Sequence, residues 1–201
     1  MNTRDIARLL ASDSVVGARF RGVFARDEFL HDFSLSPQGV RVFNTHNSRK
    51  SGAHWIAVCG DGTQVAFFDA FGRHPDVFPD VFAALGRAYD RIAWNDTILQ
   101  HVLSNTCGDY CVLFCLLWSR GWSVQRFVKR FLDITDSHKR DHAVRDVLLD
   151  VYGRDSIEAI HSDNPPLGSR LEGLDGVHVE GTGKILVRMV SIFTLVSLKR
   201  L

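Results

Sequence analysis

The sequence predicts an α+β protein built around an antiparallel strand pair and one buried helix. Two strand-like apolar runs, residues 54–59 and 64–69, flank Asp61-Gly62, and Asp-Gly between such runs is a strong hairpin signal. Cys107–Trp118 is apolar along nearly its whole length. A helix that is apolar on every side lies in the protein interior. The class therefore combines a sheet with helices packed around it.

The remaining segments are assigned from their apolar spacing and turn residues. Residues 19–35 have no clear period and are expected to wrap the surface, and residues 44–52 form a loop by composition. Further strands are expected at residues 40–43 and 94–103, and helices at residues 1–10, 77–92, 124–134 and 138–152.

Composition places the chain among ordinary globular proteins. Of its 201 residues 45% are hydrophobic and 23% are charged, which excludes collagen-like, low-complexity and wholly disordered chains. The formal net charge of +1 gives no basis for strong nonspecific nucleic-acid binding, although a local basic patch stays open. We expect a domain over residues 1–160, followed by a linker and apolar appendage over residues 161–201 that packs on the same domain.

No membrane or secretory segment is expected. Residues 1–11 carry charges through their middle, unlike a secretory signal. The longest late apolar segment, residues 185–198, is interrupted by Arg188 and is shorter than the about 20 residues that a membrane span needs. Three of the four cysteines share helical spacing, which is unlike a disulfide framework, so a reducing compartment is expected.

The hairpin brings a histidine and a carboxylate together. If Asp61-Gly62 is a two-residue turn, Cys59 faces Gln64 and His54 faces Asp69. Directly opposed residues share one face of the sheet with Cβ atoms about 4.5–5.5 Å apart, so the imidazole and the carboxylate can bond. The carboxylate would fix the tautomer and stabilise the imidazolium. An ordinary pair on a solvated face is the competing interpretation, and the position of both residues beside loops favours a functional site.

Cys107 is the candidate nucleophile because it opens the buried helix. The free N–H groups and the positive dipole end of a helix N-terminus favour a thiolate. Gly108 would leave room for a substrate backbone, and Asn105 or Thr106 could cap the first turn. Trp55 points to the face opposite His54, where it is either a core residue or a substrate contact.

Gln100 lies seven residues before Cys107, at the end of an expected strand. Its side-chain amide could donate to an oxyanion that develops beside Cys107, together with the backbone N–H of that cysteine. Cys111 and Cys115 lie deeper in the apolar stretch and are expected to be small core residues.

Short motifs in the order His, acidic residue, Gln and Cys resemble the adenovirus endopeptidase (adenain) family. The motifs are His54-Trp55, the segment Phe68-Asp69-Ala70-Phe71-Gly72, Gln100, and Cys107-Gly108. The similar stretch covers about half of the chain, over residues 22–118, and includes Asn44-Thr45 and Phe114-Cys115. Adenain is a cysteine protease that is related in fold to the Ulp1-type SUMO proteases.

The resemblance implies a central, mostly antiparallel sheet packed against a buried helix that starts at the nucleophile. It implies Cys107 as nucleophile, His54 as general base and then acid, and Asp69 as the residue that orients the imidazole. Gln100 would help to form the oxyanion hole, and Trp55 and Gly108 would contact the substrate. The reaction would be amide hydrolysis through an acyl-enzyme, with no metal or other cofactor required.

The resemblance also implies a biological setting. Family members process viral precursor proteins during maturation and prefer small residues, notably Gly, near the cut. A monomeric thiol protease acting on precursor proteins in the virion and the host cell nucleus, without a membrane partner, is therefore expected.

The sequence departs from the family at several points. Adenoviral enzymes are stimulated by a disulfide-tethered peptide and by DNA, but no cysteine between Cys59 and Cys107 could anchor a tether. The near-neutral charge also weakens the case for DNA, so an activating peptide or DNA is implied by the resemblance alone. Many adenoviral enzymes have Glu where this chain has Asp69, and residues after 122 show no match.

Three other functions remain open. An isopeptidase that removes ubiquitin or SUMO-type modifiers would use the same residues, and an inactive member of the fold would serve as a binding module. A metal-binding module would use Cys59, Cys107, Cys111 and His54 as zinc ligands. The absence of a Cys-x2-Cys knuckle and the placement of Cys59 on the face opposite His54 argue against zinc.

Overall fold

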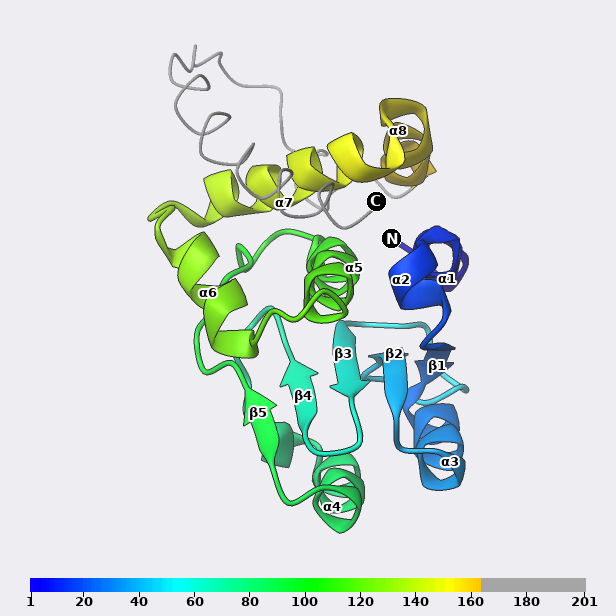
Figure 1. Cartoon of the computed structure of the whole chain (residues 1–201). Helices are drawn as coiled ribbons and strands as arrows, with labels where there is room; N and C mark the ends of the chain where they lie inside the picture. Colours follow the sequence, from blue (N-terminus) through cyan, green and yellow to red (C-terminus); the bar gives the residue numbers. More distant parts are fainter. Residues whose placement is uncertain (164–201) are drawn as a thin grey trace. The chain divides into compact units, whose positions relative to one another are not determined.

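The computed structural model describes residues 1–163, which all belong to one structural unit. It is a mixed α+β arrangement with a five-stranded sheet (Figure 1), and the expected class is confirmed. The appendage expected over residues 161–201 lies almost entirely outside the described residues. The strands are β1 (Phe20–Ala25), β2 (Gly39–Asn44), β3 (Trp55–Gly60), β4 (Val65–Phe68) and β5 (Ile92–Trp94). The helices are α1 (Thr3–Ser12), α2 (Ser14–Gly17), α3 (Arg26–Leu35), the 3₁₀ helix η1 (Pro75–Val77), α4 (Pro79–Ala88), α5 (Cys107–Trp118), α6 (Val124–Leu132), α7 (Ser137–Tyr152) and α8 (Arg154–Asp163).

The strands lie side by side in sequence order, from β1 to β5 (Figure 1). Strands β2, β3 and β4 pair antiparallel, whereas β1 pairs with β2 and β4 pairs with β5 in parallel. The expectation of a mostly antiparallel sheet is therefore corrected to a mixed sheet. Parallel neighbours need a crossover connection, and helices α3 and α4 supply one on each side of the central strands.

Two segments differ from the sequence-based prediction. Residues 19–35, expected to be an irregular surface segment, form β1 and α3. The amphipathic signal of α3 is weak because only two of its ten residues, Phe29 and Phe33, are buried. The strand expected at residues 94–103 is wrong, because β5 covers Ile92–Trp94 and residues 95–103 form no strand. The next residue, Asn95, turns its side chain onto the backbone of Asp69 instead of continuing the sheet.

The two faces of the sheet are covered by different helices. On one face, Phe68 of β4 stacks on Phe114 of α5, with ring centroids 4.5 Å apart. On the other face, an aromatic core built around Phe67 of β4 joins the sheet to α3 and α4. Side chains alternate between the two faces of a strand, and helices cover both faces of this sheet, so the central strands are buried on both sides. Their sequences are therefore continuous apolar runs.

Helix α5 lies at the centre of the described unit, and all twelve of its residues are buried. It packs on β3 and is also contacted by α1, α6 and α7 (Figure 1). The prediction of a central helix that begins at Cys107 is confirmed. Within residues 1–163, no helix combines the length and the apolar character that crossing a lipid bilayer requires.

Candidate active site

Cys107 is the first residue of α5, and only 8% of its surface is exposed. The N-cap residue is Thr106, but its side chain makes no capping bond to the helix. The Thr106 hydroxyl instead bonds to the hydroxyl of Ser104 at 2.9 Å. The thiol of Cys107 therefore lies at the positive end of a long buried helix, which is the environment that favours a thiolate.

His54 and Asp69 lie just outside the central hairpin, immediately before β3 and immediately after β4. The Nε2 atom of His54 lies 2.7 Å from the Oδ1 atom of Asp69. The side chain of His54 is 7% exposed and that of Asp69 is fully buried. The predicted pairing of the imidazole with the carboxylate is therefore confirmed, in a setting with little access to water.

The register that led to this prediction was wrong by two residues. Gly60 pairs with Val65, so the connection has four residues rather than two. The Asp61 carboxylate accepts the N–H groups of Thr63 and Gln64 and thereby closes this longer loop. A shift of two residues leaves every side chain on its original face, whereas a shift of one would have separated His54 from Asp69.

His54 also reaches the thiol of Cys107. Burial lowers the pKa of His54, but hydrogen bonds to Asp69 and to Cys107 outweigh burial and raise the pKa above its ordinary value. Since Nε2 is held by Asp69, Nδ1 is the nitrogen that can meet the sulfur. The thiol of Cys107, the imidazole of His54 and the carboxylate of Asp69 thus form one connected chain.

The turn that follows Asp69 folds back on the catalytic candidates. The Oδ1 atom of Asp69 also accepts the N–H of Phe71 at 2.9 Å, and the Oδ2 atom of Asp69 lies 2.6 Å from Nε of Arg73. The ring of Phe71 stacks on the imidazole of His54 with centroids 4.8 Å apart. Burial raises the pKa of Asp69, but His54, Arg73 and the Phe71 N–H outweigh it and lower that pKa. Asp69 is therefore an anion at neutral pH.

Gln100 is buried at 1% exposure in the loop between β5 and α5. The backbone N–H groups of Leu99 and Gln100 both donate to the carbonyl of Ala70, so this loop is tied to the turn that follows Asp69. The side-chain amide of Gln100 donates to the carbonyl of Ser104 at 2.8 Å. The side-chain amide of Gln100 has two hydrogens, so the bond to Ser104 leaves the second one available to another acceptor.

Helix α7 holds the Gln100 loop from the other side. Arg140 donates from Nε to the carbonyl of Leu99 at 2.9 Å, and Asp141 accepts the N–H of His101. The buried hydroxyl of Tyr110, on α5, donates to the same carboxylate at 3.1 Å. This network fixes the distance between the Gln100 loop and the helix that carries Cys107.

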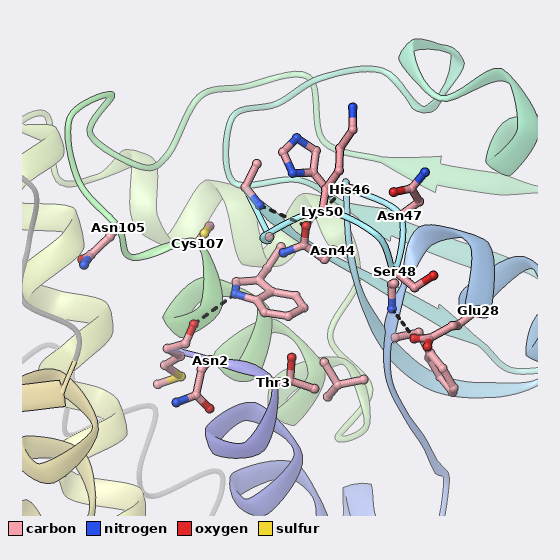
Figure 2. Close-up of a pocket in the computed structure, with 17 residues that line it drawn as sticks. Asn2, Thr3, Glu28, Asn44, His46, Asn47, Ser48, Lys50, Asn105 and Cys107 are labelled. Atoms are coloured by element: carbon pink, nitrogen blue, oxygen red, sulfur yellow. Dashed lines mark hydrogen bonds between the residues drawn. The ribbon is translucent and has the colours of Figure 1, made fainter.

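A pocket of about 520 Å³ opens beside Cys107. In Figure 2, Cys107 and Asn105 lie on one side of it, and Glu28 and Ser48 lie on the other. Trp55 lines the pocket and donates from its indole nitrogen to the carbonyl of Met1 at 3.1 Å. Trp55 is therefore a wall of the pocket rather than a core residue.

Gly108 lies against the same wall. A Cβ atom at this position would lie 3.0 Å from Cβ of Met1 and 3.4 Å from Cδ1 of Trp55. The missing side chain leaves room for these two neighbours beside the first turn of α5. At Gly108, the space that was expected for a substrate backbone therefore lies against Met1 and Trp55 of the pocket wall.

The far wall of the pocket is the loop between β2 and β3, which is fastened at two points. The side-chain oxygen of Asn44 accepts the N–H groups of His46 and Ala53, at 3.0 Å each. The carboxylate of Asp27, on α3, accepts both the backbone N–H and the hydroxyl of Ser48. The loop therefore presents a fixed surface to the pocket.

The other three cysteines are buried and belong to the core. The sulfur atoms of Cys59 and Cys115 lie 3.9 Å apart across the interface between β3 and α5. Burial raises the pKa of the thiols of Cys59 and Cys111 well above the ordinary value. No group of three or more His, Cys, Asp or Glu side chains among residues 1–163 is arranged to hold a metal ion.

Several residues of the site escaped prediction from the sequence. Asn95 contacts Asp69 only because β5 pairs with β4, and a three-residue strand gives no signal strong enough to predict that pairing. Arg73 follows Asp69 by four residues, but the turn at Gly72 that folds it back is visible only as a glycine. Arg140 and Asp141 lie on α7, and nothing in their local sequence indicates that they contact the Gln100 loop.

Comparisons with known proteins leave the family open. No family model matches this sequence, and no curated protein is similar to it at a significant level.

Proposed function

We propose that this chain is a cysteine endopeptidase of the adenain/Ulp1 type, with Cys107, His54 and Asp69 as its catalytic residues. One observation carries the proposal: a single imidazole bonds to a buried carboxylate and reaches the thiol that opens α5. The three groups come from two strand ends and a helix that are distant in sequence. Their contact in the order nucleophile, base and orienting acid is the arrangement that thiol proteases require.

In the proposed first half-reaction, the thiol proton of Cys107 moves to His54 and the sulfur attacks the carbonyl carbon of the scissile peptide bond. The carbonyl electron pair moves to oxygen, where the N–H of Cys107 and the amide of Gln100 would donate hydrogen bonds. When the carbonyl re-forms, the C–N bond breaks and the His54 imidazolium gives its proton to the leaving nitrogen. The acyl group stays on sulfur as a thioester.

In the second half-reaction, a water molecule attacks the thioester carbon while His54 accepts one of its protons. The C–S bond then breaks, the carboxylic acid product leaves, and the proton returns to the sulfur of Cys107. Asp69 remains an anion throughout, since its lowered pKa opposes proton uptake from His54. Its part is to hold the ring and to stabilise the imidazolium.

The proposed substrates are viral precursor proteins that are cleaved during maturation in the host nucleus and the virion. This choice rests on the resemblance to adenain. The pocket beside Cys107, walled by Trp55 and by the loop between β2 and β3, is the surface on which we place the substrate chain.

The test is cleavage of co-encoded structural proteins, with the products mapped by mass spectrometry. Cys107→Ala should abolish cleavage with an unchanged circular dichroism spectrum, whereas Cys111→Ala, the same change one turn later on α5, should retain it. Cleavage by the Cys107→Ala protein would refute the proposal. Turnover of ubiquitin or SUMO conjugates alone would replace it with an isopeptidase, and inactivity on every substrate would indicate a binding module.

A further inference from the structure

Asp69 has two charged partners, and only one of them is the catalytic histidine. Its Oδ1 atom faces His54, while its Oδ2 atom lies 2.6 Å from Nε of Arg73. The carboxylate is fully buried, and the side chain of Arg73 is 36% exposed. A buried anion that bonds to two cations shares its charge between them, so each cation is stabilised less than it would be alone.

The turn at Gly72 produces this arrangement. The φ angle of Gly72 is +65°, and its N–H donates to the carbonyl of Asp69 at 2.8 Å. A Cβ atom at this position would lie 2.6 Å from the carbonyl carbon of Thr97, so only glycine fits. The chain is thereby folded so that Arg73 returns to the carboxylate four residues before it.

Aromatic rings hold the guanidinium of Arg73 in place. Its central carbon lies 5.9 Å from the ring centre of Phe71 and 5.3 Å from that of Phe78. Phe71 is also the ring that stacks on His54. The same turn thus places a ring on the imidazole and a fixed cation on its carboxylate partner.

We propose that Arg73 is a positioning residue that holds Asp69 by its second oxygen and limits how tightly this carboxylate retains the His54 proton. The inference rests on the proposed function. A general acid must release its proton to the leaving nitrogen, and an imidazolium bound to an unshared buried carboxylate would release it less readily. Among residues 1–163, the titratable or charged groups that face this pair are Arg73 in the turn, and Cys107 and Cys111 on α5.

The test is an NMR titration of the His54 imidazole in a Cys107→Ala background, where neither the thiol nor self-cleavage interferes. The His54 signal is assigned by its loss in His54→Gln. Replacing Arg73 by Gln should move the titration of His54 to higher pH, because the carboxylate then acts on the imidazolium alone. Arg73→Lys, which keeps the charge, should titrate close to the unsubstituted protein, as should Arg87→Gln on the exposed side of α4.

The same variants with Cys107 restored give a second readout. Arg73→Gln should lower kcat more than it changes KM, and the limb of the pH–rate profile that the titration of His54 sets should move to higher pH. If Arg73→Gln does not fold, Arg73→Met, which keeps an unbranched chain beside the two rings, serves in its place.

An unchanged or lowered titration of His54 in Arg73→Gln would overturn the inference, as would a Lys variant that behaves like the Gln variant. This result is separable from failure of the proposed function. The titration needs no substrate, so it decides the role of Arg73 even in a chain without protease activity.

Discussion

Among residues 1–163, two histidine–aspartate ion pairs have nearly equal separations. His54 lies 2.7 Å from Asp69, and His74 lies 2.8 Å from Asp76. The first pair is 7% and 0% exposed, whereas the second is 37% and 62% exposed. His74 contacts the rings of Phe82 and Trp94, but the contact that distinguishes His54 is the sulfur of Cys107.

This difference shows what turns an ion pair into a candidate catalytic pair. Distance alone does not do it, since both pairs meet the same geometric criterion. An exposed ion pair is screened by water and contributes little to stability. A buried carboxylate that loses its partners is left as an unpaired charge, which strongly destabilises the fold. At the first pair, burial and a third reactive group occur together, and substitutions in the exposed pair serve as matched controls for these two features.

The largest expected effect is the loss of turnover in His54→Ala. Without the imidazole, neither the thiol proton nor the leaving nitrogen has a partner, so kcat/KM should fall by about a thousandfold or more. His74→Ala should leave kcat/KM within about twofold, because His74 contacts Asp76, Phe82 and Trp94 and its loss is a surface change of small free energy. Steady-state kinetics on one peptide substrate compares the two variants, and an equal loss in both would remove the distinction between the pairs.

Asp69→Asn should reduce turnover without abolishing it. The amide keeps the size of the side chain but removes the charge that stabilises the imidazolium, so a loss of about a hundredfold in kcat is expected. The matched change Asp76→Asn should leave kcat at the level of the unsubstituted protein. Full activity of Asp69→Asn would show that the carboxylate is a structural partner only.

The His54–Asp69 contact and the helix that begins at Cys107 show which features of the site can be predicted from the sequence. The contact between His54 and Asp69 was predictable because side chains alternate along strands with a period of two, so a register error of two residues leaves both side chains on the same face. The helix from Cys107 was predictable because its apolar character is continuous along twelve residues. Both features arise from local patterns, which can be recognised in a single sequence.

The parts that escaped prediction depend on non-local contacts. Strand β1 is an edge strand that pairs in parallel with β2, and its register shifts at Gly22, so no alternation is visible in residues 19–25. Asn95 acquires its role only when β5 lies beside β4. Arg140 and Asp141 reach the Gln100 loop from α7, about 40 residues away in the chain. Their roles follow from tertiary packing, which propensity and spacing do not encode.

The turn behind the His54–Asp69 pair should be sensitive to one methyl group. Gly72 and Gly121 both have positive φ angles, but a Cβ atom at Gly72 would strike the backbone of Thr97. At Gly121 no atom of residues 1–163 lies within 4 Å of that position. Gly121→Ala should therefore cost about 1 kcal/mol of unfolding free energy, and Gly72→Ala more than about 2 kcal/mol. Urea denaturation measures both, and equal costs would contradict the role of the close approach.

The buried pair should also give the stability a defined pH dependence. The pKa of Asp69 is lowered on folding, so its contribution is present above the ordinary value of 3.8 and is lost as the pH falls through the lowered value. The pKa of His54 is raised, so its contribution is complete below the ordinary value of 6.5 and is lost as the pH rises through the raised value. The pair therefore stabilises the fold most between these two ordinary values.

Calorimetry of the unsubstituted protein and of Asp69→Asn checks this dependence. The difference in Tm should be larger at about pH 5 than at an alkaline pH above the raised pKa of His54, where the imidazole is neutral. Asp76→Asn, in the exposed pair, should give a small difference at both values. A larger effect of Asp69→Asn at the alkaline value would contradict the assignment of the raised pKa to His54.

The most direct test of the central claim is the rate at which iodoacetamide alkylates the folded protein, followed by intact-mass and peptide mass spectrometry. We predict a single rapid modification, at Cys107, at about pH 7, because the thiols of Cys59 and Cys111 are buried with raised pKa values. His54→Ala should slow this reaction by about tenfold or more, and His74→Ala should leave its rate unchanged. Equal rates in the two histidine variants would contradict the account, since they would show that the imidazole of His54 does not activate the sulfur of Cys107.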